Sequence, residues 1–190
     1  MGRVSRERAR ENRAKVVEAA SSLFLRKGLD GVGIREVMAE VGLTQGGFAG
    51  QFGSKDALAG EACSFAFDHA EQAWRNACQG NAKERVRRMI AFYLASNAAR
   101  RGCPLAALGV DVGRAPAGGP VRRAFTVGLQ RLARVIDPDR SNDRALAVMA
   151  AMVGAAILRR ASDDGALADQ IDGAVRHLAD EGIPYRDDGF

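Results

Sequence analysis

The chain has 190 residues, of which 47% are hydrophobic, and a formal net charge of +5. This length suits one compact domain or a small domain joined to a larger one. Three cysteines without paired spacing argue against a disulfide framework. The longest apolar run, residues 145–158, is too short to span a bilayer, and residues 1–10 lack the apolar segment of a signal peptide. We therefore expect a cytoplasmic protein that is not embedded in a membrane.

The charge is distributed unevenly along the chain. Residues 1–55 carry ten Lys and Arg against six Asp and Glu, whereas residues 56–190 carry eighteen against seventeen. The basic charge of residues 1–55, beside the near-neutral residues 56–190, predicts an anionic partner for the N-terminal part. The alternative is that the basic residues form a solvated N-terminal tail.

Apolar residues recur with helical spacing and predict an all-α fold of about nine helices without strands. The first helix contains Val16 to Phe24 and ends at Gly28. A short helix from about Ile34 ends at Gly42, and Thr44 is expected to cap a third helix that ends near Gln51. Ser54 is expected to cap a fourth helix that runs to about residue 78. Further helices are expected near residues 82–99, 104–113, 118–136, 141–162 and 166–181.

The second and third segments have the form of a helix-turn-helix. Gly42 supplies the turn, where a left-handed backbone favours glycine. Leu43, Phe48 and Phe52 are expected to anchor the third helix from within. In such a motif the second of the two helices enters the DNA major groove. The residues left to face outward are Thr44, Gln45, Gly46, Gly47 and Ala49.

The stretch from Val16 to Leu58, "VVEAASSLFLRKGLDGVGIREVMAEVGLTQGGFAGQFGSKDAL", resembles the DNA-binding domain of the TetR family of bacterial transcription regulators. The matching features are "AA..LF...G", "REV", "GLTQGGF" and "F.SKDAL", in this order. The resemblance implies a homodimer with an N-terminal DNA-binding domain, placed at residues 1–54, and a C-terminal ligand-binding and dimerisation domain, placed at residues 55–190. It also implies a repressor that a small molecule releases from double-stranded operator DNA.

The resemblance implies phosphate contacts by Arg35, Thr44 and Lys55, and the amide of Gln45 suits bidentate contact with adenine. The arginines at positions 3, 6, 8 and 10 are expected to follow the DNA backbone or to enter the minor groove. The predicted DNA-binding set is Arg35, Thr44, Gln45, Gly46, Gly47, Ala49, Gln51 and Lys55.

The chain departs from the family pattern at four positions. Ala49 stands where tyrosine is usual, Gln51 where histidine is frequent, Gly33 where a Thr or Ser cap is usual, and Met38 where a small residue is usual. Gly46, Gly47 and Gly50 would leave the third helix narrow, so that its backbone could lie close to the base edges.

In the body of the chain, the last two helices resemble the family's dimerisation pair, and packing within one subunit is the alternative. The predicted dimerisation residues are Ala147, Ala151, Gly154, Ala155, Leu167, Ile171, Val175 and Leu178. A cavity for a mostly apolar effector is expected among the fourth to seventh helices, with core packing as the alternative for each side chain. The candidate lining residues are Phe67, Trp74, Met89, Phe92, Tyr93, Cys103, Phe125 and Leu129.

Cys103 follows two arginines and precedes a predicted helix, an environment that favours the thiolate. It supports the alternative that the protein is an electrophile or redox sensor on the same DNA-binding scaffold. The competing interpretation is that Cys103 is an inert cysteine in a turn. A helical ligand-binding protein without DNA binding is a further alternative. His69 and His177 lie far apart, and no catalytic or metal-binding motif is present, so we expect no enzyme, no metal and no cofactor.

Overall fold

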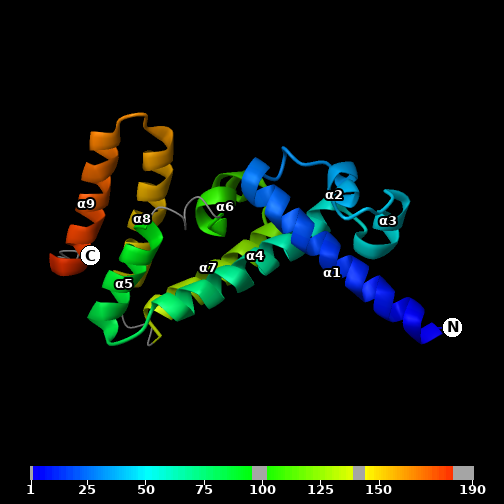
Figure 1. The fold of residues 1–190 in the computed structure, drawn as a ribbon, viewed down its shortest axis with the longest axis horizontal. Helices are drawn as coiled ribbons and strands as arrows, with labels where there is room; N and C mark the ends of the chain where they lie inside the picture. Colours follow the sequence, from blue (N-terminus) through cyan, green and yellow to red (C-terminus); the bar gives the residue numbers. More distant parts are fainter. Residues whose placement is uncertain (1, 96–101, 139–143, 182–190) are drawn as a thin grey trace. The chain divides into compact units, whose positions relative to one another are not determined.

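The computed structural model describes residues 2–95, 102–138 and 144–181, and within these ranges it contains nine helices and no strand. The all-α fold is thus confirmed (Figure 1). The helices are α1 (Gly2–Lys27), α2 (Ile34–Glu40), α3 (Gly46–Phe52), α4 (Lys55–Ala77), α5 (Ala82–Leu94), α6 (Pro104–Arg114), α7 (Pro120–Ile136), α8 (Arg144–Ala161) and α9 (Gly165–Glu181). In the described part of the chain, no helix combines the length and the apolar character that crossing a membrane requires.

The helices pack into two compact units. Unit 1 comprises the described residues up to 70 together with 102–129, and unit 2 comprises the described residues of 71–101 and 130–190. The boundaries fall inside α4 and inside α7. The predicted boundary between residues 54 and 55 separates a DNA-binding domain from a ligand-binding domain by function, whereas the two units are defined by packing. The predicted boundary therefore stays a prediction.

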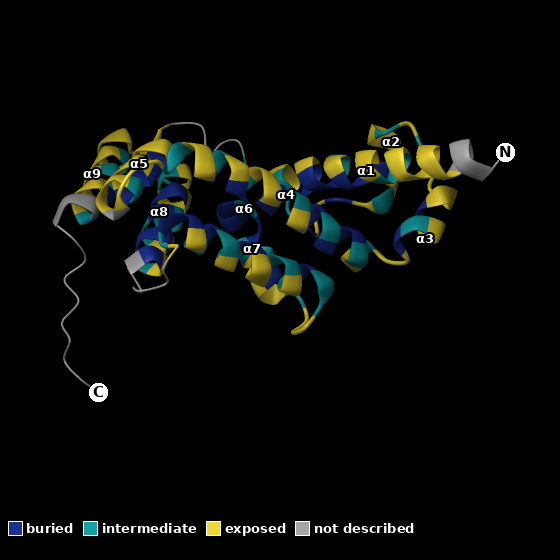
Figure 2. Cartoon of the chain, turned by 90° about the horizontal axis from the view of Figure 1, so that it is seen from below, coloured by how far each residue is buried: buried dark blue, intermediate teal, exposed yellow. Residues whose placement is uncertain are grey.

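In unit 1, one face of α1 is buried from Val16 to Phe24 (Figure 2). The helix ends at Gly28, whose φ of 77° places it in the left-handed region that favours glycine. The amide of the next residue, Leu29, donates a 2.8 Å hydrogen bond to Asp111 Oδ2 on α6. This bond attaches the turn between α1 and α2 to α6, because the donor and the acceptor are 82 residues apart.

Two glycines bring α4 and α7 close together within unit 1. A Cβ on Gly60 would lie 3.0 Å from Pro120, and a Cβ on Gly128 would lie 2.1 Å from the ring of Phe67. The Phe67 ring also meets Phe125 edge to face, with 5.4 Å between the centroids. Gly60 and Gly128 therefore allow an approach that no larger residue would permit without movement.

Unit 2 is built on α5, α8 and α9, which contact one another pairwise. Asn81 and Glu84 form a capping box at the start of α5. Arg159 on α8 pairs with Asp172 on α9 at 3.1 Å. In the same unit, Glu71 accepts hydrogen bonds from Arg75 and Arg131.

The structure locates the start of α1, which the apolar spacing left open, and corrects the start of α3. α1 begins at Gly2, so the basic residues before Val16 continue the helix. α3 begins at Gly46 with Gln45 as its N-cap, so the prediction that Thr44 caps this helix is wrong. The Thr44 carbonyl accepts the amide hydrogen of Gly47 at 3.2 Å instead, which tightens the first turn. The predicted cap at Ser54 is confirmed, because its Oγ accepts a 3.0 Å bond from the Ala57 amide.

Candidate nucleic-acid interface

A tight turn joins α2 to α3. Gly42 has a φ of 68° and donates its amide hydrogen to the Ala39 carbonyl at 3.0 Å. The Leu43 amide donates to the Met38 carbonyl at 2.9 Å, so these two bonds satisfy two of the carbonyls at the end of α2. The prediction that Gly42 makes the turn is confirmed.

The inner face of α3 is held by two aromatic rings. Phe48 and Phe52 are buried, and their rings stack with 5.5 Å between the centroids. The guanidinium of Arg13, on α1, lies 4.6 Å from the centroid of the Phe52 ring. The same guanidinium makes two hydrogen bonds of 2.5 and 2.6 Å to the carboxylate of Glu61 on α4. Arg13 thus links α1, α3 and α4.

The outer face of α3 is bare. The predicted outward residues Thr44, Gln45, Gly46, Gly47 and Ala49 are all exposed. A Cβ added to Gly46 or Gly50 would meet no heavy atom within 4 Å, and one added to Gly47 would meet only Met38 Cε and Gln51 Nε2, each at 4.0 Å. None of these three glycines has a positive φ. The packing of the chain itself therefore does not require glycine at these positions.

The remaining predicted DNA-binding residues lie on α2, on α3 and at the start of α4. Arg35 is exposed on the first turn of α2, and Lys55 is half-buried at the first position of α4. Gln51 is half-buried, and its Oε1 atom is buried without a hydrogen-bond partner in the described part of the chain. Its amide is therefore less available to DNA than that of Gln45.

Two departures from the family pattern have a structural outcome. Gly33 is the N-cap of α2 and makes no side-chain hydrogen bond there, so α2 starts without a side-chain cap. Met38 is buried, with a relative exposure of 1%, and its Cε fills the space beside Gly47.

The predicted ligand-binding residues fall in both units. Phe67, Cys103, Phe125 and Leu129 belong to unit 1, whereas Trp74, Met89, Phe92 and Tyr93 belong to unit 2. In unit 2, the Trp74 and Tyr93 rings meet edge to face with 6.1 Å between the centroids, and Met89 is fully buried. These contacts are those of ordinary core packing, and ligand binding stays a prediction.

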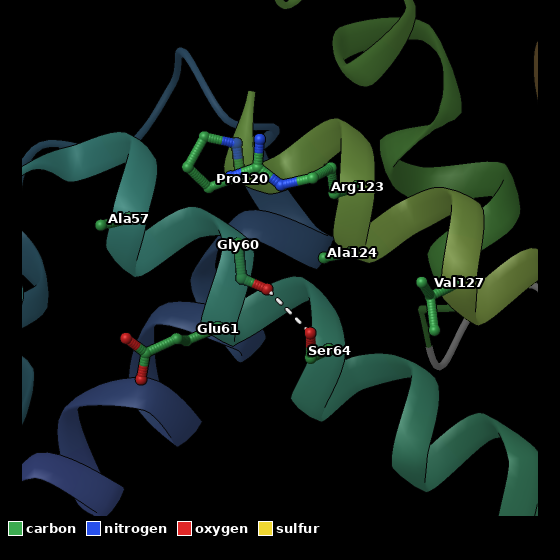
Figure 3. Close-up of a pocket in the computed structure, with 8 residues that line it drawn as sticks. All are labelled: Ala57, Gly60, Glu61, Ser64, Pro120, Arg123, Ala124 and Val127. Atoms are coloured by element: carbon green, nitrogen blue, oxygen red, sulfur yellow. Dashed lines mark hydrogen bonds between the residues drawn. The ribbon is translucent and has the colours of Figure 1, made fainter. Parts of the chain in front are cut away.

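Unit 1 has a groove of about 440 Å³ between α4 and α7 (Figure 3). It contains none of the predicted ligand-binding residues. Ser64, on one wall, donates its hydroxyl hydrogen to the Gly60 carbonyl at 3.1 Å. The groove is lined by Ala57, Gly60, Glu61, Ser64, Pro120, Arg123, Ala124 and Val127.

The three cysteines are shielded to different degrees. Burial raises the pKa of Cys63 to about 12. Burial also raises the pKa of Cys78 to about 11, although nearby Arg85 acts to lower it. Cys103 is the N-cap of α6 and is buried, with a relative exposure of 7%. The two arginines before it lie outside the described residues. Cys63 and Cys78 are therefore thiols rather than thiolates at neutral pH.

The predicted dimerisation residues divide by exposure. Ala155 and Val175 are buried within the chain itself, so they contribute to the core of unit 2 rather than to its surface. Leu167 is 45% exposed, and Ala147, Ala151, Gly154, Ile171 and Leu178 are half-buried. Three large apolar side chains outside the predicted set are also exposed on α8, namely Leu146, Ile157 and Leu158. Their spacing places Leu146 and Ile157 on one outward face of the helix with Gly154.

Sequence reasoning also missed Arg13, Glu61 and Asp111, which hold the N-terminal helices in place. For Arg13 a signal was available, because it stands seven residues before Ala20 and so shares the buried face of α1. Asp111 gave no such signal, because its partner is a distant backbone amide.

Residues 16–62 match the family model described as "Bacterial regulatory proteins, tetR family". No curated protein sequence matches the chain significantly. Among solved structures, the fold is similar to that of a TetR transcriptional regulator from Chloroflexus aurantiacus J-10-FL, with a TM-score of 0.70, 21% identity, and coverage of 92% of this chain and 97% of the other.

Two further solved structures have similar folds. For Escherichia coli NemR in its reduced form, the TM-score is 0.68 with 18% identity, and the match covers 88% of this chain and 96% of the other. For a protein from Saccharomonospora viridis in complex with choline, the TM-score is 0.66 with 20% identity, and the match covers 93% of this chain and 99% of the other.

At these identities the structural likeness shows the fold, whereas the family model covers the helix-turn-helix. The helix-turn-helix lies within the residues that the family model matches, and the all-helical body agrees with the fold of the solved structures. Residues 16–62 are therefore similar to the tetR family of bacterial regulatory proteins, and the described helices have the fold of solved TetR regulators.

Proposed function

We propose that the protein is a homodimeric repressor that binds a palindromic DNA operator through α3 and is released by a small, mostly apolar effector. The observation that carries the DNA-binding part is the bare outer face of α3. Gly46 and Gly50 have open space around them, so packing within the chain does not explain their lack of side chains, and a contact outside the chain would explain it. Each glycine within a helix costs about 1 kcal/mol relative to alanine, which is a reason to expect a compensating role.

In this proposal the α3 backbone approaches the base edges closely. Gln45, which is exposed at the N-cap, offers an amide that can pair with adenine. Thr44 precedes α3, Arg35 lies on α2 and Lys55 begins α4, and all three side chains are suited to phosphate contacts. Ala49 lacks the hydroxyl of the tyrosine usual in the family, and its methyl group suits contact with a thymine methyl.

Exposed apolar residues on α8 support dimerisation. Leu146 and Ile157 share an outward face of α8 with Gly154. A Cβ added to Gly154 would meet no heavy atom within 4 Å, so the helix surface is open at this position. An apolar face that remains exposed in one chain favours a partner helix, and a twofold pair would present two recognition helices to successive half-sites. We expect Ile157→Glu to shift the protein to monomer in light scattering after size exclusion, while Val110→Glu, at an exposed apolar site in unit 1, leaves the mass unchanged.

The proposed release from DNA by an effector is supported by the family resemblance and by the thermodynamic linkage between effector binding and DNA binding. A ligand that binds the DNA-free arrangement of the dimer more tightly must weaken DNA binding by the same factor. One similar structure holds choline, which supports a small-molecule site in this fold. The thiol-sensor alternative has support from the fold of NemR in its reduced form, but the burial of Cys103 weighs against rapid reaction.

The direct test is a gel shift with the DNA that flanks the protein's own gene. The proposal predicts a discrete complex that weakens steeply as salt rises from about 50 to 200 mM, because phosphate contacts release counterions. Absence of any complex at low salt would favour a ligand-binding protein without DNA binding. A complex that dissociates only after treatment with an electrophile, and that persists in Cys103→Ser, would favour the thiol sensor.

A further inference from the structure

The first part of α1 extends beyond the packed core of unit 1. The side chains from Arg6 to Glu11 are exposed, and burial begins at Val16 (Figure 2). Residues 2–15 carry six basic and two acidic side chains. A polar helix without packing is marginally stable in water, so this segment is suited to a partner of opposite charge.

A single row of residues connects this segment to the core. Successive positions in the row are four or three residues apart, which keeps them on one face of the helix. The three positions nearest the C-terminus, Val17, Ala20 and Phe24, are buried, whereas Arg6 and Arg10 are exposed. The face that packs on unit 1 therefore continues as an arginine row. The row consists of Arg6, Arg10, Arg13, Val17, Ala20 and Phe24.

Arg13 shows which part of the domain this row faces. Its guanidinium lies over Phe52 of α3 and is bonded to Glu61. At 1.5 Å per residue, Arg10 and Arg6 lie about 4.5 and 10.5 Å further along the helix on the same side. Neither of these two forms an ion pair with any residue that the structure describes. Both therefore project past the packed core on the side where α3 lies.

We infer that Arg6 and Arg10 form a second DNA contact, in which the helical arm lies along the phosphate backbone beside the groove that α3 enters. This inference rests on the proposed DNA binding by α3. Arginine suits the partner because its planar guanidinium binds phosphate oxygens in a bidentate manner.

The helical form of the arm decides between the two modes expected from the sequence. A helix with side chains is about 10–12 Å in diameter, whereas the minor groove is about 6 Å wide. An extended arm could enter the minor groove, but this helix is too wide for it. The helix itself therefore stays outside the minor groove and lies along the phosphate backbone.

The opposite face of the same helix provides a matched control. Arg8 and Lys15 lie roughly 160–180° around the helix from the arginine row, at 100° per residue. Both are exposed. The variants Arg6→Ala/Arg10→Ala and Arg8→Ala/Lys15→Ala remove the same charge, and alanine preserves the helix. Far-ultraviolet circular dichroism checks that each double variant keeps its helix content.

The experiment measures affinity by fluorescence anisotropy on a duplex from upstream of the protein's own gene, between about 50 and 200 mM salt. For Arg6→Ala/Arg10→Ala we expect the slope of log K against log salt to fall by about 0.9 for each phosphate that is no longer neutralised, hence about 1.8 per protomer. The control double variant should lower the slope by less than half as much. Exchanging A·T for G·C pairs in the flanks of the duplex should change the affinity of the wild type less than about twofold. Such a change would reflect only the sequence-dependent shape of the DNA and no base contact by the arm.

Equal slopes of log K against log salt for the two double variants would overturn the inference. Arg6 and Arg10 would then affect DNA binding only through the net charge of the protein and not through their position on the helix. A preference of the wild type for A·T flanks that disappears in Arg6→Ala/Arg10→Ala would also overturn it in favour of minor-groove entry. A wild-type protein that binds no duplex at low salt would overturn the proposed function itself, and the inference with it.

Discussion

The carboxylate of Asp111, on α6, accepts the backbone amide hydrogen of Leu29 at 2.8 Å and so attaches the DNA-binding helices to α6. The same oxygen would lie 2.7 Å from a Cβ on Gly28, which a positive φ already restricts to glycine. One carboxylate therefore fixes both the end of α1 and the start of the turn that leads to α2.

Substitution of Asp111 tests this attachment. We expect Asp111→Ala to lower the free energy of unfolding by about 1–3 kcal/mol, because it leaves the Leu29 amide without its partner. Asp111→Asn keeps an acceptor oxygen and should be less destabilising. Urea denaturation measures the change, with Asp30→Ala as the control at an exposed carboxylate on the same turn. Equal stability of Asp111→Ala and wild type would show that the bond does not hold the turn.

Alanine at the recognition helix separates stability from binding. Gly50→Ala adds a methyl group in open space, so we expect it to stabilise the protein by up to about 1 kcal/mol. If the α3 backbone approaches the bases closely, Gly46→Ala and Gly47→Ala should weaken DNA binding at least about tenfold, by about 1.4 kcal/mol, without a decrease in stability. Thermal unfolding and anisotropy together give the comparison. Alanine variants that are more stable and bind DNA as tightly would refute the close approach.

Glu71 predicts a pH dependence of stability in unit 2. Burial acts to raise the pKa of Glu71, but hydrogen bonds and charge from Arg75 and Arg131 outweigh it, so that the pKa is lowered. A carboxyl group with a lowered pKa stabilises the fold above its unfolded pKa of about 4.3, and this contribution is lost as the pH falls through the folded pKa. We expect Glu71→Gln to cost about 1–3 kcal/mol at neutral pH and progressively less below about pH 4.

Urea denaturation of wild type and Glu71→Gln across this pH range checks the prediction. Glu18→Gln, at an exposed glutamate on α1, is the control. A difference between Glu71→Gln and wild type that grows as the pH falls would contradict the assignment of a lowered pKa.

Thiol labelling examines the alternative based on Cys103. Cys63 and Cys78 have pKa values raised to about 12 and about 11, and Cys103 is buried. We expect iodoacetamide to label the native protein slowly at all three positions near neutral pH, because the thiolate is the nucleophile. Mass spectrometry of the native protein and of the urea-unfolded protein gives the rates. Rapid labelling of Cys103 alone in the native protein would strengthen the sensor alternative.

Much of the fold could be predicted from the sequence because its signals are local. Apolar spacing locates the helices, and Gly28, Gly42 and Ser54 end or cap them where expected. The cap at Thr44 was misplaced because a backbone turn, rather than a side chain, starts α3. The extension of α1 to Gly2 was missed because its residues have no apolar periodicity to signal a helix.

The site could be predicted in part. The exposed residues Thr44 to Gly47 follow from the motif, since its buried positions Phe48 and Phe52 fix the register. The ligand-binding candidates depend on contacts between distant helices, which a single sequence does not contain. Burial of Ala155 and Val175 likewise depends on how α8 and α9 pack within the chain.

The central claim is that α3 reads DNA through Gln45. Selection of bound fragments from sheared genomic DNA by the purified wild-type protein and by Gln45→Ala tests it most directly. We expect the wild type to enrich a palindromic sequence, and Gln45→Ala to lose preference at an adenine in each half-site, equivalent to about 1–3 kcal/mol. Enrichment of the same sequence by both proteins, or no enrichment by the wild type, would contradict the account.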